Sequence, residues 1–229
     1  MSHELDKVIN NLSIDCVIFG FEKGRLEVLL IKRAIEPSKS KWALPGGFIL
    51  KEEDLNKAAE RILKDTSGLE DIYLDQLHAF GDINRYPERR VITIAYYALV
   101  SPDKYKLHPG IDTSEVKWFP FSNLPPLPFD HSTIIFEAIN KLRIKVRYQP
   151  IGFELLPKKF TIPKLQLLYE SILDTKLDKR NFRKKLSKTG LLIKLDEKDK
   201  NNIRRAAHLY KFDNKNYKKL LKKGINFDL

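Results

Sequence analysis

The chain has 229 residues, of which 42% are hydrophobic, enough for one large domain or two ordinary domains with real cores. No run of about 18 or more apolar residues occurs, so the sequence predicts no membrane-spanning helix and no membrane partner. Residues 1–10 lack the apolar core of a secretory signal, and the single cysteine, Cys16, excludes an internal disulfide. These features predict a cytoplasmic protein.

The formal net charge of +12 is distributed unevenly along the chain. Residues 1–149 contain 21 Lys and Arg against 21 Asp and Glu, whereas residues 150–229 contain 21 against 9. The whole positive excess therefore lies in the second segment. This division predicts two domains, 1–149 and 150–229, of which only the second is suited to binding a polyanion.

The first segment mixes strand and helix patterns. Runs of β-branched and apolar residues predict strands at 14–21, 26–33, 42–44, 72–80, 90–100 and 116–120, the first two as a hairpin. Helical spacing of apolar residues predicts helices from Leu55 and from His131. This mixture indicates an α+β fold or an α/β/α sandwich.

The turn before the first helix is Pro45-Gly46-Gly47, in which two glycines allow the backbone to approach another group closely. We expect Glu52, Glu53 and Asp54 in the first turn of the helix, where the helix dipole favours negative charge. Gly68 is expected to end it as a left-handed cap.

This strand, loop and helix resemble the Nudix box, whose pattern is Gly, five residues, Glu, seven residues, Arg-Glu-apolar-x-Glu-Glu-x-Gly-apolar. The residues that match in register are Gly47, Glu53, Arg61, Leu63, Gly68 and Leu69. The family's magnesium-binding glutamates are replaced by Ile62 and by Asp65-Thr66. Because Mg²⁺ requires several hard oxygen ligands, we expect a retained scaffold with no metal, no cofactor and no catalytic residues. An active diphosphate hydrolase would need other ligands, such as Glu53, Glu60 and Asp65.

The second segment has the order of a winged helix-turn-helix. After a short expected strand at 153–156, Thr161 is an expected N-cap, and a second helix is expected to start after Asp178 and stop at Gly190. Only Phe182 and Leu186 are apolar within that second helix. Strands at 191–195 and 208–212 around a charged loop, and a basic helical tail at 217–223, complete the pattern.

The second helix and the loop carry the candidate DNA contacts. Arg180 and Asn181 are suited to reading guanine and adenine, whereas the lysines are suited to phosphates. A solvated charged surface, or one facing RNA or a membrane, is the alternative, but the confinement of charge to one domain favours DNA. The full set is Lys179, Arg180, Asn181, Arg183, Lys184, Lys185 and Lys188 on the helix, with Lys198, Lys200, Arg204 and Arg205 in the wing.

The pairing of a degenerate Nudix box with this module resembles the Nudix-related bacterial transcription regulators, most closely their arabinose-sensing branch. The segments that carry the resemblance are QPIGFELLPKKFT, LQLLYESIL, LDKRNFRKKL and LYKF. The resemblance implies a Nudix-like α/β/α sandwich followed by a winged helix, and a homodimer on a palindromic double-stranded operator. It implies a repressor of sugar utilisation that responds to a small effector such as L-arabinose in the former catalytic pocket. A regulator of NAD metabolism that responds to ADP-ribose is the alternative.

The effector site is expected near the box and at strand ends. The candidates are Asp15, Lys32, Arg33, Trp42, Phe48, Asp82, Arg90 and His131. Asp15 interrupts an apolar strand, although an ion pair with Arg33 or Arg90 would explain it equally well. Trp42 and Phe48 are also consistent with core positions, and His131 with a simple helix start.

Overall fold

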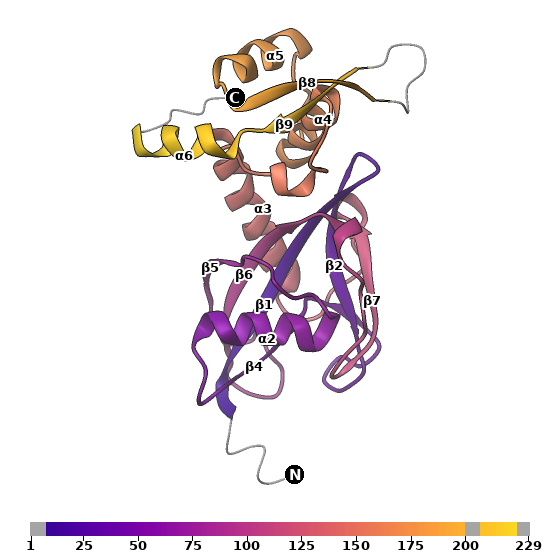
Figure 1. The fold of residues 1–229 in the computed structure, drawn as a ribbon. Helices are drawn as coiled ribbons and strands as arrows, with labels where there is room; N and C mark the ends of the chain where they lie inside the picture. The colour runs from indigo at the N-terminus through magenta and orange to yellow at the C-terminus, as the bar shows by residue number, and fades with distance from the viewer. Residues whose placement is uncertain (1–7, 200–206, 224–229) are drawn as a thin grey trace. The chain divides into compact units, whose positions relative to one another are not determined.

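The protein was analysed as a computed structural model, which describes residues 8–199 and 207–223 (Figure 1). Its contacts divide the chain into two compact units, one of residues 1–20 with 27–140 and one of residues 21–26 with 141–229. The division falls within helix α3, His131–Tyr148, whereas the charge distribution predicted a domain boundary after residue 149. Among the residues that the structure describes, no helix is both long and apolar enough to cross a membrane.

The first unit is built on a seven-stranded mixed sheet with the order β3-β2-β1-β6-β5, to which β4 adds beside β1 and β7 beside β2. Strand β1 runs parallel to β6, and the other registered pairs are antiparallel. The strands are β1 Val8–Glu22, β2 Arg25–Arg33, β3 Trp42–Ala43, β4 Gly46–Leu50, β5 Asp75–Phe80, β6 Ile92–Val100 and β7 Thr113–Pro120. The hairpin and each expected strand of this segment are therefore present.

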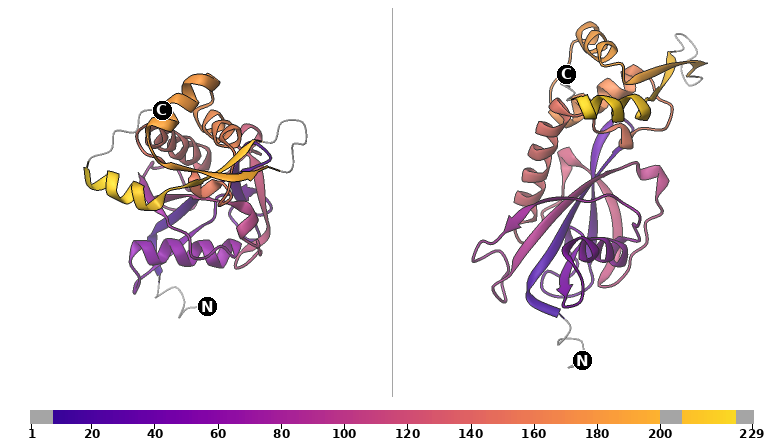
Figure 2. Two further views of the ribbon diagram at one scale, coloured as in Figure 1. Left: turned by 45° about the horizontal axis from the view of Figure 1, so that its top comes forward. Right: turned by 60° about the vertical axis from the view of Figure 1, so that its left-hand side comes forward.

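Helices cover both faces of this sheet (Figures 1 and 2). Side chains alternate along a strand, so Ile14, Cys16 and Ile18 of β1 share one face and join the core beneath helix α2, Leu55–Ser67. Asp15 lies on the opposite face, where α3 begins at His131. This arrangement confirms the predicted α/β/α sandwich.

Helix α2 begins at Leu55, after the three acidic residues that were expected in its first turn. Asp54 is the N-cap, and its carboxylate accepts from the N–H groups of Asn56 and Lys57. Glu53 lies before the helix and accepts from the Leu50 N–H at 2.8 Å, so the expectation of an acidic first turn was wrong. The predicted C-terminal cap is confirmed, because Gly68 adopts φ 76°.

The second unit begins with a correction. Residues 153–156 were expected to form a strand, but Phe153–Leu155 is a 3-10 helix, η3. Gly152 turns the chain with φ 90°, and the Phe153 ring then stacks on Phe212 at 4.2 Å between centroids. Burial of this aromatic ring, rather than local strand propensity, decides the conformation.

The remaining elements of the second unit follow the winged helix-turn-helix order. Thr161 and Asp178 cap their helices as predicted, accepting from the N–H groups of Lys164 and Asn181. Phe182 is buried against Tyr169, with ring centroids 5.7 Å apart. The elements are α4 Ile162–Leu173, α5 Lys179–Lys188, β8 Leu192–Lys198, β9 His208–Phe212 and α6 Asn214–Lys223, with β8 antiparallel to β9.

Candidate functional site

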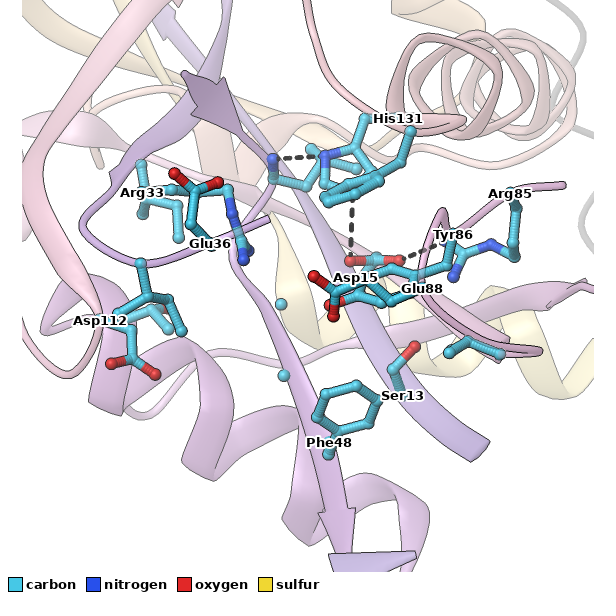
Figure 3. A pocket seen from close by; sticks show the side chains of 18 of the residues that line it. Ser13, Asp15, Arg33, Glu36, Phe48, Arg85, Tyr86, Glu88, Asp112 and His131 are labelled. Atoms are coloured by element: carbon cyan, nitrogen blue, oxygen red, sulfur yellow. Dashed lines mark hydrogen bonds and ion pairs between the residues drawn. The ribbon is translucent and has the colours of Figure 1, made fainter. Parts of the chain in front are cut away.

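A cavity of about 350 Å³ opens in the first unit where β1, β2, β4 and the start of α3 meet (Figure 3). Its size falls at the lower end of the range for small-molecule sites. Its polar and aromatic lining consists of Ser13, Asp15, Arg33, Glu36, Phe48, Thr66, Arg85, Tyr86, Glu88, Arg89, Asp112, Phe129 and His131. The cavity therefore combines aromatic faces with charges of both signs.

A buried ion cluster forms one wall of the cavity. Arg85 donates a hydrogen bond from Nη2 to Asp15 Oδ2 at 3.0 Å. It donates two more to the Asp130 carboxylate, from Nη2 at 2.8 Å and from Nε at 2.9 Å. Only 3% of the Arg85 side chain and 9% of the Asp15 side chain is exposed. Burial works to lower the pKa of Arg85, but the hydrogen bonds and charges of Asp130 and Asp15 raise it above its ordinary value. The guanidinium is thus held as a permanent cation between two carboxylates.

His131 joins this cluster in a defined protonation state. The Leu44 N–H donates to His131 Nδ1 at 3.0 Å, so Nδ1 accepts and the proton lies on Nε2, 3.5 Å from Asp15 Oδ1. Burial lowers the pKa of His131 below its ordinary value of 6.5, although the charge of Asp15 opposes the shift. The imidazole is therefore neutral at physiological pH and bridges β1 to the segment before β4.

This neutral histidine predicts an acid-sensitive fold. As the pH falls through 6.5, the unfolded chain protonates His131 whereas the folded chain does not, so stability is lost until the lower folded pKa is reached. The loss is at most about 1.4 kcal/mol per pH unit from this one group. Urea unfolding at a series of pH values between 7.5 and 5 measures it.

The control for this prediction is His131→Asn, whose side-chain oxygen can still accept from the Leu44 N–H. We expect the variant to show a flatter stability profile over this range. An unchanged slope in His131→Asn would assign the acid sensitivity to other groups.

Gly46 explains how the carboxylate of Asp15 fits at the edge of β4. The two residues are register partners, and a Cβ at position 46 would collide with Asp15 Oδ1. The close approach expected of the two glycines is confirmed, with the buried carboxylate as the group approached. The turn expected at Pro45-Gly46-Gly47 is not, because Gly46 and Gly47 are the first residues of strand β4 and pair with β1.

Aromatic rings and arginines face the rest of the cavity. The Tyr86 ring stacks on Phe129 at 5.2 Å, Arg33 lies 5.5 Å over Phe129, and Arg89 lies 4.6 Å over Phe48. Phe129 adopts φ 58°, a left-handed conformation that is strained for a bulky residue and is typical of functional sites. Flat rings beside guanidinium groups suit a ligand with a planar ring and negative charge.

The structure brings together half of the effector residues that the sequence analysis named. Asp15, Arg33, Phe48 and His131 line the cavity, whereas the other four lie outside its lining. Lys32 pairs with Glu115 at 2.6 Å and packs over Trp42, and the Trp42 ring in turn contacts Phe119. Asp82 accepts a hydrogen bond from the Asn84 N–H, and Arg90 is exposed. Lys32 and Arg33 separate because neighbouring residues of a strand face opposite sides.

Sequence reasoning missed Arg85, Tyr86, Arg89 and Phe129. The first three lie in the charged segment between β5 and β6, and Phe129 lies in the proline-rich segment between β7 and α3. An aromatic residue flanked by arginines in a long connection was the available signal.

The residues of the Nudix-like box do not fit a magnesium ion. The Ile62 side chain packs close to Gly47, so that a Cβ added to Gly47 would lie 3.3 Å from Ile62 Cγ1. Ile62 has no atom that could bind a metal. Of the three carboxylates named as alternative ligands, Arg61 engages two, donating to Glu53 at 2.6 and 2.8 Å and lying 3.5 Å from Asp65, while Glu60 is exposed. Hydrogen bonding from Arg61 lowers the pKa of Glu53. Within residues 8–199 and 207–223, no group of three or more His, Cys, Asp or Glu side chains is arranged to hold a metal.

Helix α5 presents the predicted basic face. Phe182 and Leu186 are buried, while Lys185 is half-buried. The exposed members of the predicted set are Lys179, Arg180, Asn181, Arg183, Lys184 and Lys188 on α5 and Lys198 on β8. Lys200, Arg204 and Arg205 of the predicted wing lie outside the described residues.

The fold defines a protein with a Nudix-type domain, in which the cavity lies, followed by a winged helix of the DNA-binding type. Residues 10–138 match the model of the NUDIX domain, and residues 152–212 match the model of the NrtR DNA-binding winged helix domain. The chain is 35% identical over 213 residues to the ADPR responsive transcriptional repressor NtrR of Acinetobacter baylyi, a match that covers 90% of this chain and 83% of the relative. The chain belongs to the NrtR family of DNA-binding transcriptional repressors.

Two solved structures support this assignment. NrtR of Shewanella oneidensis complexed with a 27mer DNA superimposes with a TM-score of 0.76 at 31% identity, covering 88% of this chain and 93% of that chain. The NUDIX domain of the same NrtR complexed with ADP ribose superimposes with a TM-score of 0.54 at 33% identity, covering 58% of this chain and 88% of that chain.

Proposed function

We propose that this repressor binds ADP-ribose, or a closely related nucleotide, in the cavity of its first unit, and that occupancy changes its affinity for the operator. The observation that carries the proposal is the pairing of aromatic faces with arginines around the cavity. Tyr86 and Phe129 offer stacked rings for an adenine, and Arg33 and Arg89 offer positive charge for a diphosphate. Carboxylates in the same lining, such as Glu36 and Asp112, are suited to ribose hydroxyls.

L-Arabinose, the effector expected from the sequence, fits these features less well. A pentose offers hydroxyl groups but neither a flat aromatic ring nor a negative charge, so it would leave the arginines and ring faces unused. Two of the similar proteins are described with ADP-ribose, one as ADPR responsive and one as complexed with ADP ribose, and none with a sugar effector. A nucleotide therefore accounts for more of the lining.

We further propose that the first unit binds its ligand without hydrolysing it. The support lies in Ile62, which replaces a metal-binding glutamate, and in Arg61, which engages Glu53 and Asp65. Absence of Mg²⁺-dependent turnover of ADP-ribose is the expected result. Turnover that disappears in Asp65→Ala would instead favour the hydrolase alternative.

The proposed regulation requires the effector to prefer one of two states of the protein. Helix α3 is suited to couple them, because it begins beside the cavity at His131 and continues into residues 141–148, which belong to the second unit. We propose a homodimer on a palindromic operator, with α5 as the reading helix in each copy.

Calorimetry with ADP-ribose and with L-arabinose tests the effector. We expect heat of binding with ADP-ribose and a change in the gel shift of upstream DNA when it is added. Phe129→Ala should weaken ADP-ribose binding about tenfold because a stacking face is lost. Phe136→Ala is the matched control, since that side chain is 57% exposed on α3 and does not line the cavity.

Two outcomes would contradict the effector proposal. One is binding of L-arabinose with no detectable binding of ADP-ribose. The other is an equal loss of affinity in Phe129→Ala and Phe136→Ala, which would place the ligand away from the cavity.

A further inference from the structure

The last helix of the chain, α6, carries a stripe of exposed lysines that the family's winged-helix model does not include. That model ends at residue 212, and α6 spans Asn214–Lys223. The lysine stripe consists of Lys215, Lys218, Lys219 and Lys222, which recur at the three- and four-residue spacing of one helical face. All four side chains are exposed.

The opposite side of α6 is fixed to the second unit. Tyr217 packs against Phe212 with ring centroids 5.5 Å apart, and Asn216 donates from Nδ2 to the Gly190 carbonyl at 2.8 Å. Gly190 lies just beyond the C-terminal end of α5, the candidate reading helix. These contacts fix the start of α6 beside the C-terminal end of α5. From there α6 extends away from β9 (Figures 1 and 2).

Helix stability does not account for the lysine stripe. Lysines three and four residues apart repel one another, and each such pair costs about 0.2–0.5 kcal/mol in an isolated helix. Lys215 also lies in the first turn, where the helix dipole disfavours a cation. In the described part of the chain, no ion pair neutralises any of the four. A polyanion would relieve this repulsion.

We propose that the lysine stripe contacts the phosphate backbone of the same DNA duplex that α5 reads, beyond the bases that α5 reaches. The inference rests on the DNA binding assigned to the family. Its independent support is the charge of the stripe, the absence of neutralising partners among the described residues and the hydrogen bond that ties α6 to the end of α5. Phosphate contacts of this kind raise affinity and fix position but carry no sequence preference.

The salt dependence of DNA binding by the full chain tests the proposal. The variant K215Q/K218Q/K219Q/K222Q and the wild type are titrated with a 40-bp random-sequence duplex over a range of salt concentrations. Each phosphate contact contributes about 0.9 to the slope of log K against log salt, so we expect the variant's slope to be shallower by about 2–4. Specific preference for upstream DNA over random DNA should stay unchanged.

The matched control is K41Q/K51Q/K104Q/K106Q, which removes the same charge from exposed lysines of the first unit. Its slope should equal that of the wild type if local contacts, rather than net charge, are responsible. Hydroxyl-radical footprints on the upstream fragment should be shorter at the flanks for the α6 variant. Circular dichroism confirms that the variants are folded.

Three results would overturn the proposal. The first is an unchanged slope and footprint in a folded α6 variant that still binds DNA. The second is an equal change in the control variant. The third is a change in oligomeric state in the α6 variant alone, which would make the stripe part of a contact between copies. If the wild type binds no DNA, the DNA-binding function itself fails, and that result is distinct from the other three.

Discussion

Replacing Arg85 by methionine is expected to destabilise the protein by about 3–5 kcal/mol. Arg85 lies between Asp15 and Asp130, and its removal would leave two buried carboxylates without a compensating charge. The methionine would fill part of the volume, so the loss would report the missing charge more than a cavity. Urea unfolding followed by fluorescence and circular dichroism measures the change.

Two further variants make this prediction specific. Arg90→Met changes a nearby exposed arginine that does not line the cavity, and it should cost no more than about 0.5 kcal/mol. In Arg85→Met/Asp130→Asn, the second change removes one of the stranded charges, so the double variant should lose less than the sum of the single losses. Strict additivity, or a loss below about 1 kcal/mol in Arg85→Met, would show that the cluster is well solvated.

Replacing Arg180 by alanine should weaken binding to the operator by about 1–3 kcal/mol, or about fivefold to 150-fold. Arg180 is exposed in the first turn of α5, the part of a reading helix that reaches base edges. Binding to random-sequence DNA should change much less, because a base contact contributes little without its base. Gel shifts with upstream and random duplexes at one salt concentration measure both affinities.

Lys188→Ala serves as the contrasting variant on the same helix. Lys188 is exposed in the last turn of α5, where a phosphate contact is expected. Its loss should lower the salt slope by about 0.9 and leave sequence preference unchanged. If Arg180→Ala lost affinity equally on operator and random DNA, Arg180 would be a phosphate contact as well.

Sequence reasoning was most accurate where neighbouring residues decide the structure. Thr161 and Asp178 cap helices that begin just after them, and Gly68 ends α2, because caps depend on short-range hydrogen bonds and on glycine's access to positive φ. The buried pair Phe182 and Leu186 on α5 followed from helical spacing alone. The strand expected at 153–156 failed because aromatic packing from β9, far along the chain, outweighs local propensity.

The sequence by itself determined the two-part organisation, most of the local elements, the replacement of the glutamates expected from the Nudix box and the basic face of α5. Only the tertiary structure decided the cavity. Arg85 reaches Asp15 across 70 positions of sequence, and Tyr86 meets Phe129 from another connection, neither of which has a periodic pattern. Periodicity reports which face of an element is buried, but it cannot report which side chains from separate connections meet, because that depends on how the whole sheet and its helices pack.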